Sequence, residues 1–507
     1  MGYLQTYLHR PRSLHAAVFI YFVTTGGRFT APFLENVANF TDTVNGLTLA
    51  AQVGIDALLG PVAGTLADAL ESKRYPHLRH RGRGLVMTLG VTVGTAAFIL
   101  HGVVAYTCDE ERLSCSSHTT TALHVFLRLL FATGNSFVYP VLNGITLTFL
   151  DDEGCPQTQY GKERLYGAVS WAVTSVIVGW AIDVGGFPIL PFLFAPIGYC
   201  VYMISIVAFI GRPECAAVAQ DDSTDSSDIM PSNENANQIQ KFQDDSVDKF
   251  RDDDDDDDVS GGDDNTTSLL QMLALVCGTV YGIGFIASML TLAMGMSIVE
   301  SLIFLFFEQL GGSYTIMGLS VVVTVIFEIP VFHFAPSLLE KFGPGRLQQA
   351  AAIAYMIRVI GYTLIPEGAM AWVLVLEPLH GITYGCAATS SVQYMAQLSP
   401  KGYEATAQGI LSGVRGVGSI FGLSLGGWID DAYGPKILYR AYASIVAIGL
   451  GIFLFTDQRE RAYHRLAHES TSADNTYSTN ADDRRHAVEM ELPVTNAGPT
   501  TEQISVL

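Results

Sequence analysis

Two apolar runs of membrane length stand back to back in the stretch Ser297–Lys341, SIVESLIFLFFEQLGGSYTIMGLSVVVTVIFEIPVFHFAPSLLEK. Each run contains one glutamate, Glu300 or Glu328, among Ile, Leu, Phe and Val. A charged side chain at the centre of a bilayer costs about 2.5–3.5 kcal/mol on insertion scales, so these glutamates should face the interior of a helix bundle. The stretch therefore predicts two transmembrane helices that carry buried ionisable groups.

The same pattern occurs earlier in the chain, shifted by 272 positions, so that Ser297–Lys341 overlies the region of Arg28 to Asp68. Ionisable residues then stand at matching depths in both copies. The sequence predicts a two-fold internal repeat. The matched residues are Glu300 with Arg28, Gly318-Leu319-Ser320 with Gly46-Leu47-Thr48, Glu328 with Asp56, Leu338 with Leu66 and Glu340 with Asp68.

Composition indicates a polytopic helical membrane protein. The 507 residues are 49% hydrophobic and 15% charged, with a mean hydropathy of +0.31. A hydrocarbon layer needs about 20 apolar residues per helix, and the short alternating segments of a membrane barrel are not visible. The chain is predicted to be an all-α membrane protein with twelve transmembrane helices. They are expected near 14–33, 44–67, 84–106, 120–149, 166–184, 188–210, 285–308, 315–338, 347–365, 370–396, 404–427 and 437–456.

Charge and polarity divide the chain into five parts. Of the net charge of −21, the interval 212–267 contributes −14, and it is too polar to fold alone. The apolar segment 269–284 is interpreted as an extension of the seventh span or an interfacial helix, in preference to a thirteenth span. The expected parts are a cytosolic N-terminus (1–13), a six-helix bundle (14–211), an acidic disordered cytosolic linker (212–267), a second six-helix bundle (268–456) and a disordered cytosolic tail (457–507).

Both termini are predicted to be cytosolic, because 21 of the 28 Lys and Arg residues then lie in cytosolic segments. The run 14–33 is too long for a signal-peptide core and is interpreted as a retained span. The sequence leaves open whether the membrane is the plasma membrane or that of an organelle. Cys108 and Cys115 share one non-cytosolic loop, where they form either a disulfide or two free thiols.

Gly64-Thr65-Leu66-Ala67-Asp68, followed after an insertion by Arg81-Gly82-Arg83, resembles the loop between the second and third spans of the major facilitator superfamily. Four further stretches resemble the branch that contains the lactose and nucleoside proton symporters and major facilitator superfamily domain-containing protein 6. The resemblance implies two six-helix pseudo-repeats. The four stretches are Tyr160–Gly167, Gly179–Asp183, Phe327–Pro330, and Ala405–Gly409 with Gly427–Asp430.

In that superfamily, spans 1, 4, 7 and 10 surround a central cavity, and here each carries one charge. The resemblance therefore implies a basic wall from Arg28 and Arg128 and an acidic wall from Glu300 and Glu377. His380, one turn beyond Glu377, is expected to share its proton. A desolvated carboxyl holds its proton more tightly, and a nearby arginine opposes this, so the acids are the candidates for proton coupling.

Other intramembrane residues have a structural interpretation beside a functional one. Asp56 and Arg415 are expected to latch the halves in one conformation, and Glu328 with Arg358 to form a structural ion pair. Asp68 is expected to act in a cytosolic gate, as the resemblance implies. Tyr139 and Asn143 provide either neutral hydrogen bonds to a solute or interior packing. The glycines of spans 5 and 11 are interpreted as packing residues.

The sequence thus predicts a secondary transporter that moves a small polar organic solute, such as a sugar, a nucleoside or a related metabolite, by alternating access with a proton. The alternative is a non-transporting solute sensor on the same fold. Expected partners are the solute, the proton, the lipid bilayer and a cytosolic adaptor at the linker or tail. No enzyme, cofactor, metal or nucleic acid is expected, because no nucleotide loop, metal cluster or nucleophile–base set is visible.

Overall fold

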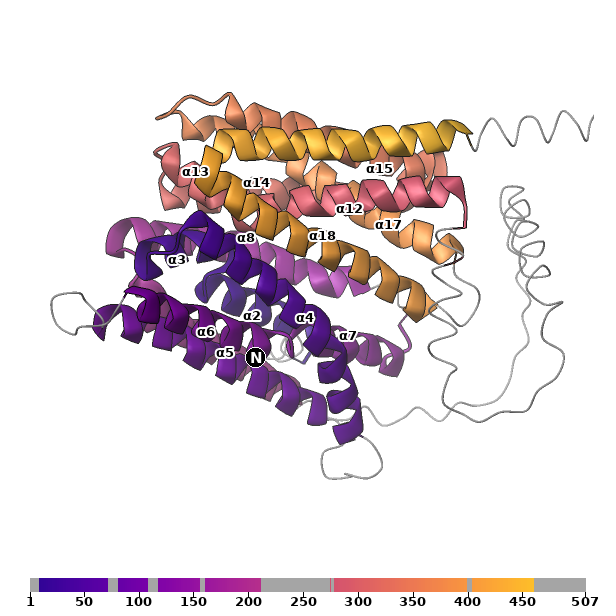
Figure 1. Cartoon of the computed structure of the whole chain (residues 1–507). Helices are drawn as coiled ribbons and strands as arrows, with labels where there is room; N and C mark the ends of the chain where they lie inside the picture. Colours follow the sequence, from indigo (N-terminus) through magenta and orange to yellow (C-terminus); the bar gives the residue numbers. More distant parts are fainter. Residues whose placement is uncertain are drawn as a thin grey trace, which may run out of the picture.

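The computed structural model describes residues 9–71, 81–107, 117–155, 160–210, 274, 278–398 and 404–459, and all regular structure within them is helical. The helices form two groups that follow the sequence (Figure 1). The group up to residue 210 is called the N-terminal half, and the group from residue 278 onward the C-terminal half. The expected linker 212–267, half of segment 269–284, Cys108, Cys115 and nearly all of the tail lie outside the described residues.

The N-terminal half contains helices that end where Gly, Pro or polar residues interrupt the apolar runs. Pro11 occupies the first helical position of α2, where its missing N–H costs nothing. The helices are α2 (Pro11–Thr24), η1 (Gly27–Phe29), α3 (Thr30–Ala38), α4 (Asp42–Glu71), α5 (Gly82–Thr107), α6 (Ser117–Asn135), α7 (Tyr139–Asp152), α8 (Tyr160–Gly185), η4 (Leu190–Phe194) and α9 (Ala195–Ile210).

The C-terminal half is likewise built of helices. The side chains of Thr279 and Ser313 cap α12 and α14 by accepting hydrogen bonds from the backbone N–H of Gly282 and Ile316. The helices are α12 (Val280–Ser301), α13 (Ile303–Gln309), α14 (Tyr314–His333), α15 (Ala335–Thr363), η5 (Met370–Trp372), α16 (Val373–Leu376), α17 (Pro378–Leu398), α18 (Glu404–Tyr433) and a last helix, Pro435–Arg459.

Nine helices among the described residues are long and apolar enough to cross a membrane. The other three expected spans coincide with helices that miss this criterion. The first is divided into α2, η1 and α3, and the tenth into α16 and α17, while the ninth lies in α15. The expected eighth span ends earlier than predicted, because α14 ends at His333. Within α15 the chain turns at Gly343 (φ 73°).

Breaks interrupt the helices expected to line the cavity. Gly26 and Gly27 have φ values of 115° and 50°, a backbone that glycine adopts readily, and they turn the chain into η1, which carries Arg28. The C-terminal counterpart is the break at Leu302, directly after Ser301. Glu377 lies between α16 and α17, where Pro378 follows it. Charged groups of spans 1 and 10 thus lie at helix interruptions, and Glu300 lies just before one.

The two halves are in backbone contact at the end where α4 and α14 begin, which is called the outer end because the charge distribution predicts it to be non-cytosolic. A Cβ on Gly179 of α8 would lie 2.1 Å from the carbonyl oxygen of Tyr314, and one on Gly427 of α18 would lie 2.4 Å from that of Asp42. Toward the other end of α4 and α18, a Cβ on Gly64 or Gly409 would meet none of the described residues within 4 Å. Figure 1 shows α4 and α18 side by side near α3 and apart at their opposite ends.

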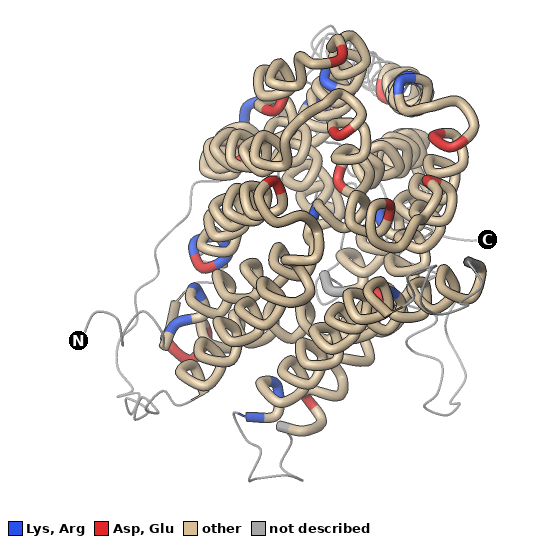
Figure 2. Tube along the Cα trace, turned by 90° about the vertical axis from the view of Figure 1, so that its left-hand side faces the viewer, with Lys and Arg blue, Asp and Glu red and all other residues tan. Residues whose placement is uncertain are grey.

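Most of the membrane-spanning trace is uncharged, and a few isolated charged positions lie inside the bundle (Figure 2). The large buried side chains are mainly aromatic and aliphatic, and they include Arg358 with no exposed surface. At the inner end, Glu163 accepts hydrogen bonds from the backbone N–H of Arg12 (2.9 Å) and from its guanidinium (3.1 Å). This pair fastens the start of α2 to α8.

Candidate functional site

A cavity of about 410 Å³ lies between the two halves. Phe22, Arg28 and Tyr139 line it from spans 1 and 4, and Arg164 and Trp171 line it from α8. The C-terminal half supplies Glu300, Glu328, His380 and Tyr384. The volume falls within the range of about 300–1,000 Å³ that is typical of small-molecule sites.

The cavity has one basic wall and one acidic wall. Arg28 and Arg164 are its lining cations, both from the N-terminal half, and Glu300 and Glu328 are its lining anions, both from the C-terminal half. Glu300 lies deep in the protein yet is open to the cavity. Arg28 also lies over the ring of Trp171, with 5.1 Å from its guanidinium carbon to the ring centroid, as in a cation–π contact.

His380 joins the two halves. Its Nε2 lies 3.0 Å from an N–H group of Arg28, and its Nδ1 contacts the guanidinium of Arg358. Arg358 was expected to pair with Glu328, but it contacts His380 instead, and Glu328 lines the cavity. An arginine guanidinium carries only donors and a neutral imidazole has one acceptor nitrogen, so only one of these two contacts can be a hydrogen bond.

Glu377 occupies a different environment from the other expected site residues. It is 2% exposed and accepts hydrogen bonds from the hydroxyls of Tyr362 (2.7 Å) and Thr324 (2.8 Å). It is not among the residues that line the central cavity. Its contacts connect α14, α15 and the α16–α17 break, which gives Glu377 a positioning role next to His380.

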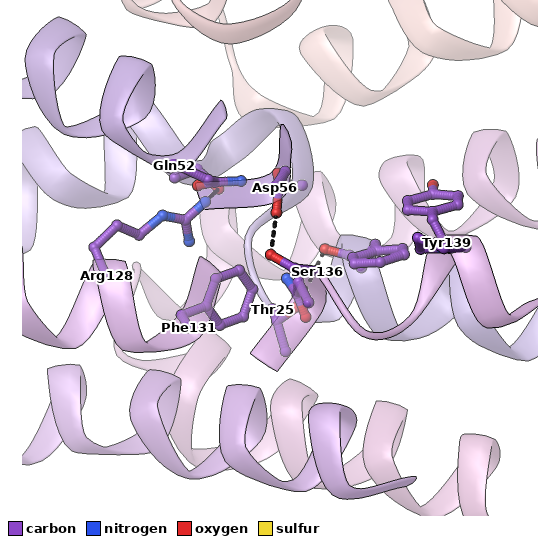
Figure 3. Close-up of a pocket in the computed structure, with 12 residues that line it drawn as sticks. Thr25, Gln52, Asp56, Arg128, Phe131, Ser136 and Tyr139 are labelled. Carbon is purple, nitrogen blue, oxygen red and sulfur yellow. Dashed lines mark hydrogen bonds between the residues drawn. The ribbon is translucent and has the colours of Figure 1, made fainter. Parts of the chain in front are cut away.

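A polar branch of about 370 Å³ extends from the central cavity into the N-terminal half, with Phe22, Gly27 and Tyr139 shared by both. Asp56 and Arg128 line this branch, and Asp56 accepts a hydrogen bond from Ser136 at 2.7 Å. Figure 3 shows the Arg128 guanidinium pointing toward Gln52 and Asp56. Arg128 is 4% exposed, and its Nε is without a hydrogen-bond partner among the described residues. This branch can hold a polar group of a solute.

A second branch of about 250 Å³ enters the C-terminal half, with Glu300 and Tyr384 shared with the central cavity. Arg415 lines it together with Gln348 and polar serine side chains. Asp56 and Arg415, expected to latch the halves together, therefore line separate branches, each within its own half.

The remaining expected site residues lie at the cavity mouth or at the surface. Tyr139 stacks on Phe22, with 4.8 Å between ring centroids and 7° between ring planes, and it lines the cavity. Asn143 is exposed and accepts a hydrogen bond from Tyr160 at 2.6 Å. Asp68 forms an ion pair with Arg83 at 2.9 Å, so the loop motif is connected across its insertion.

Sequence reasoning missed several lining residues, among them Arg164, Trp171 and Tyr384. Arg164 lies in the motif Tyr160–Gly167, which served only as evidence of the family resemblance. Trp171 lies two turns further along the same helix, and Tyr384 lies one turn beyond His380. The signal that could have identified Arg164 was its place as a further cation near the start of an apolar span.

The fold is that of a solute transporter. Over 89% of this chain and 99% of the other, it is similar to a point mutant of the nucleoside transporter NupG, with 14% identity and a TM-score of 0.60. It is also similar to the D-xylose–proton symporter, with 13% identity, coverage of 88% and 95%, and a TM-score of 0.55. With nine apolar helices of membrane-spanning length among the described residues and this fold, the protein is an integral multi-pass membrane protein.

Residues 12–441 match the MFS_1 like family, and the chain belongs to that family. The chain is 27% identical over 158 residues to a maltose permease of Geobacillus stearothermophilus, and 26% identical over 164 residues to the uncharacterized transporter YwbF of Bacillus subtilis. These alignments cover 31% and 32% of this chain, and the chain spans 40% of the length of each relative.

Proposed function

We propose that the protein moves a small polar organic solute, such as a sugar or a nucleoside, across the membrane by alternating access coupled to a proton. The observation that carries the proposal is the charge-divided cavity between the halves. A solute held there contacts Arg28 and Arg164 on one side and Glu300 and Glu328 on the other. Motion of one half against the other separates these contacts, which suits binding at one face and release at the opposite face.

The chemistry of the lining supports a hydroxyl-rich ring as the solute. Guanidinium groups donate to hydroxyl or carbonyl oxygens, and carboxylates accept from hydroxyl or amino groups. Trp171, Phe22 and Tyr384 add aromatic faces beside these polar groups. The names of a maltose permease, a D-xylose–proton symporter and a nucleoside transporter among the similar proteins agree with this class.

Glu300 is the proposed coupling residue. It lines both the central cavity and the C-terminal branch, and Arg28 and Arg415 lie within electrostatic reach of its carboxyl. Arg28 belongs to the opposite half, so rocking of the halves changes this interaction. A carboxyl that gains and loses a cationic neighbour during the cycle is suited to take up and release one proton.

Binding to the purified full-length protein tests the recognition step. Radiolabelled sugars, nucleosides and zwitterionic solutes are offered in turn, and the affinity of the best solute is compared between variants. Arg164→Gln is expected to weaken binding about tenfold or more, because a hydrogen bond to a charged group contributes about 1.5–3 kcal/mol. Arg346→Gln is the matched control, since Arg346 is exposed at the inner end and does not line the cavity.

Equal affinities of the two variants would contradict the proposed cavity as the solute site. If Arg164→Gln loses binding and the wild-type protein binds the solute without taking it up into vesicles, the result would support a solute sensor in place of a transporter. Binding together with uptake supports the proposal.

A further inference from the structure

The outer ends of α8 and α18 carry the same sequence pattern, a Gly-Trp pair followed by aspartate. In α8 it is Gly179-Trp180-Ala181-Ile182-Asp183, and in α18 it is Gly427-Trp428-Ile429-Asp430-Asp431. Gly179 corresponds to Gly427, Ile182 to Asp430, and Asp183 to Asp431. Each pattern packs against the start of a helix in the opposite half, α14 or α4.

These two contacts are related by the internal repeat. A Cβ on Gly318 of α14 would lie 2.3 Å from the carbonyl oxygen of Ser175, and one on Gly46 of α4 would lie 2.5 Å from that of Leu423. Gly318 and Gly46 are repeat partners. The α8–α14 contact and the α4–α18 contact therefore have the same backbone geometry, and they close the outer end together.

Their electrostatics differ. In the α8–α14 contact, the Asp183 carboxylate accepts hydrogen bonds from the backbone N–H groups of Tyr314 (2.8 Å) and Thr315 (2.9 Å) and from the Thr315 hydroxyl (2.5 Å). A carboxylate at a helix N-terminus is stabilised by these donors and by the helix dipole. The α8–α14 contact thus supplies three hydrogen-bond donors to its aspartate.

The α4–α18 contact concentrates negative charge. Asp431 accepts one hydrogen bond, from the hydroxyl of Thr43 at 2.6 Å. Asp42 occupies the position of Tyr314, and Asp430 occupies that of Ile182. Asp430 is 4% exposed, and its Oδ1 has no hydrogen-bond partner among the described residues.

The groups around Asp430 are mostly acids. Asp42 of α4, Glu35 of α3 and Asp431 of its own helix lie within electrostatic reach, and Tyr439 of the last helix faces it with a hydroxyl that is also unpartnered among the described residues. Asp42 and Glu308 also lie within electrostatic reach of Glu35. In the described part of the chain, no group of three acidic, histidine or cysteine side chains is arranged to hold a metal ion.

We propose that the α4–α18 contact is a proton-binding site, with Asp430 as its central carboxyl, and that proton binding there stabilises the closed outer end. Closing brings Asp42, Asp430 and Asp431 together and removes Asp430 from water. A proton therefore binds more tightly to the closed than to the open outer end. By linkage, a lower pH at the outer face increases the closed fraction. This site is separate from the solute cavity.

The distance between labels at Val184 and Tyr433 reports closure, because both residues are exposed at the outer end, one in each half. Spin labels are placed there in the cysteine-depleted full-length protein, and the closed-to-open ratio is measured from pH 8 to pH 5 without solute. The ratio is expected to rise by up to about tenfold per pH unit for one linked proton. Asp430→Asn should abolish most of this dependence.

Asp183→Asn is the matched control, because it removes an aspartate from the related contact that contains no surplus acid. It should retain the pH dependence of the wild type. Asp430→Glu, which preserves the carboxyl, should also retain it, and thermal unfolding confirms that each variant is folded. An unchanged pH dependence in both Asp430→Asn and the double variant Asp430→Asn/Glu35→Gln would overturn the proposal. The measurement needs no solute, so its outcome is independent of the proposed transport function.

Discussion

Gly179→Ala should open the outer end of the protein. The new Cβ would lie 2.1 Å from the carbonyl oxygen of Tyr314, whereas an ordinary van der Waals contact is at least 3.4 Å, so α8 and α14 must separate by about 1.3 Å. The obstacle is backbone, which cannot rotate away as a side chain can. Overpacking of this kind costs about 1–3 kcal/mol, and only the closed outer end bears it.

A free-energy change of that size alters the ratio of open to closed outer ends by about 5- to 150-fold. The assay is alkylation of a single cysteine at Ala168, which lines the central cavity, by an impermeant maleimide added at the outer face. The rate should rise by that factor, because the reagent enters only when the outer end is open.

Gly413→Ala is the control for this experiment, because a Cβ at Gly413 would meet no other part of the described chain within 4 Å. Each substitution changes helix propensity by the same amount in the open and the closed state, so this effect does not alter the ratio of open to closed outer ends. Equal alkylation rates in Gly179→Ala and Gly413→Ala would refute the conclusion that the α8–α14 contact closes the outer end.

Three further predictions concern stability, measured by thermal or denaturant unfolding of the purified protein. Glu377→Ala leaves two buried hydroxyls without an acceptor, so the free energy of unfolding should fall by about 1–3 kcal/mol, and by less in Glu377→Gln. Equal losses in the two variants would contradict the hydrogen-bonded role of Glu377. Glu163→Ala removes the acceptor of the Arg12 backbone N–H and guanidinium, so the free energy of unfolding should fall by about 1.5–3 kcal/mol. A loss below about 0.5 kcal/mol would be inconsistent with this anchoring of α2 to α8. Arg83→Ala breaks a pair whose partner Asp68 is 67% exposed, so the change should be below about 1 kcal/mol, and a larger one would show that the loop bears on stability.

The helical membrane fold could be predicted because hydropathy and the internal repeat are properties of the sequence alone. The repeat register is confirmed in three dimensions, since Gly46 and Gly318 make equivalent contacts in the two halves. The glycines interpreted as packing residues behave differently from one another. Gly179 and Gly427 pack against the opposite half, whereas Gly409 has no such close neighbour in the part of the chain that the structure describes.

The rotation of each helix could not be predicted. Spans that are apolar all round carry no signal for the side that faces the cavity. Glu328 therefore lines the cavity, where a structural pair with Arg358 was expected, and Arg164 joins the basic wall without having been proposed. Glu377 was expected in the acidic wall of the cavity, but it is hydrogen-bonded to Thr324 and Tyr362, which come from other helices that the sequence does not visibly bring together.

Helix breaks explain a further part of the difference between the predicted and the observed site. The turn that places Arg28 comes from Gly26 and Gly27, whose positive φ values depend on the surrounding packing. Arg28 consequently meets His380 of the opposite half. That contact between halves depends on tertiary packing, and no local pattern predicts it.

Uphill solute uptake into proteoliposomes driven by an imposed proton gradient tests the central claim most directly. The wild-type protein should accumulate the solute that binds best, and Glu300→Gln should bind it but fail to accumulate it when the gradient is applied. Glu340→Gln, an exposed acid at the inner end, should behave as the wild type. Proton-driven accumulation that is undiminished in Glu300→Gln would contradict the account.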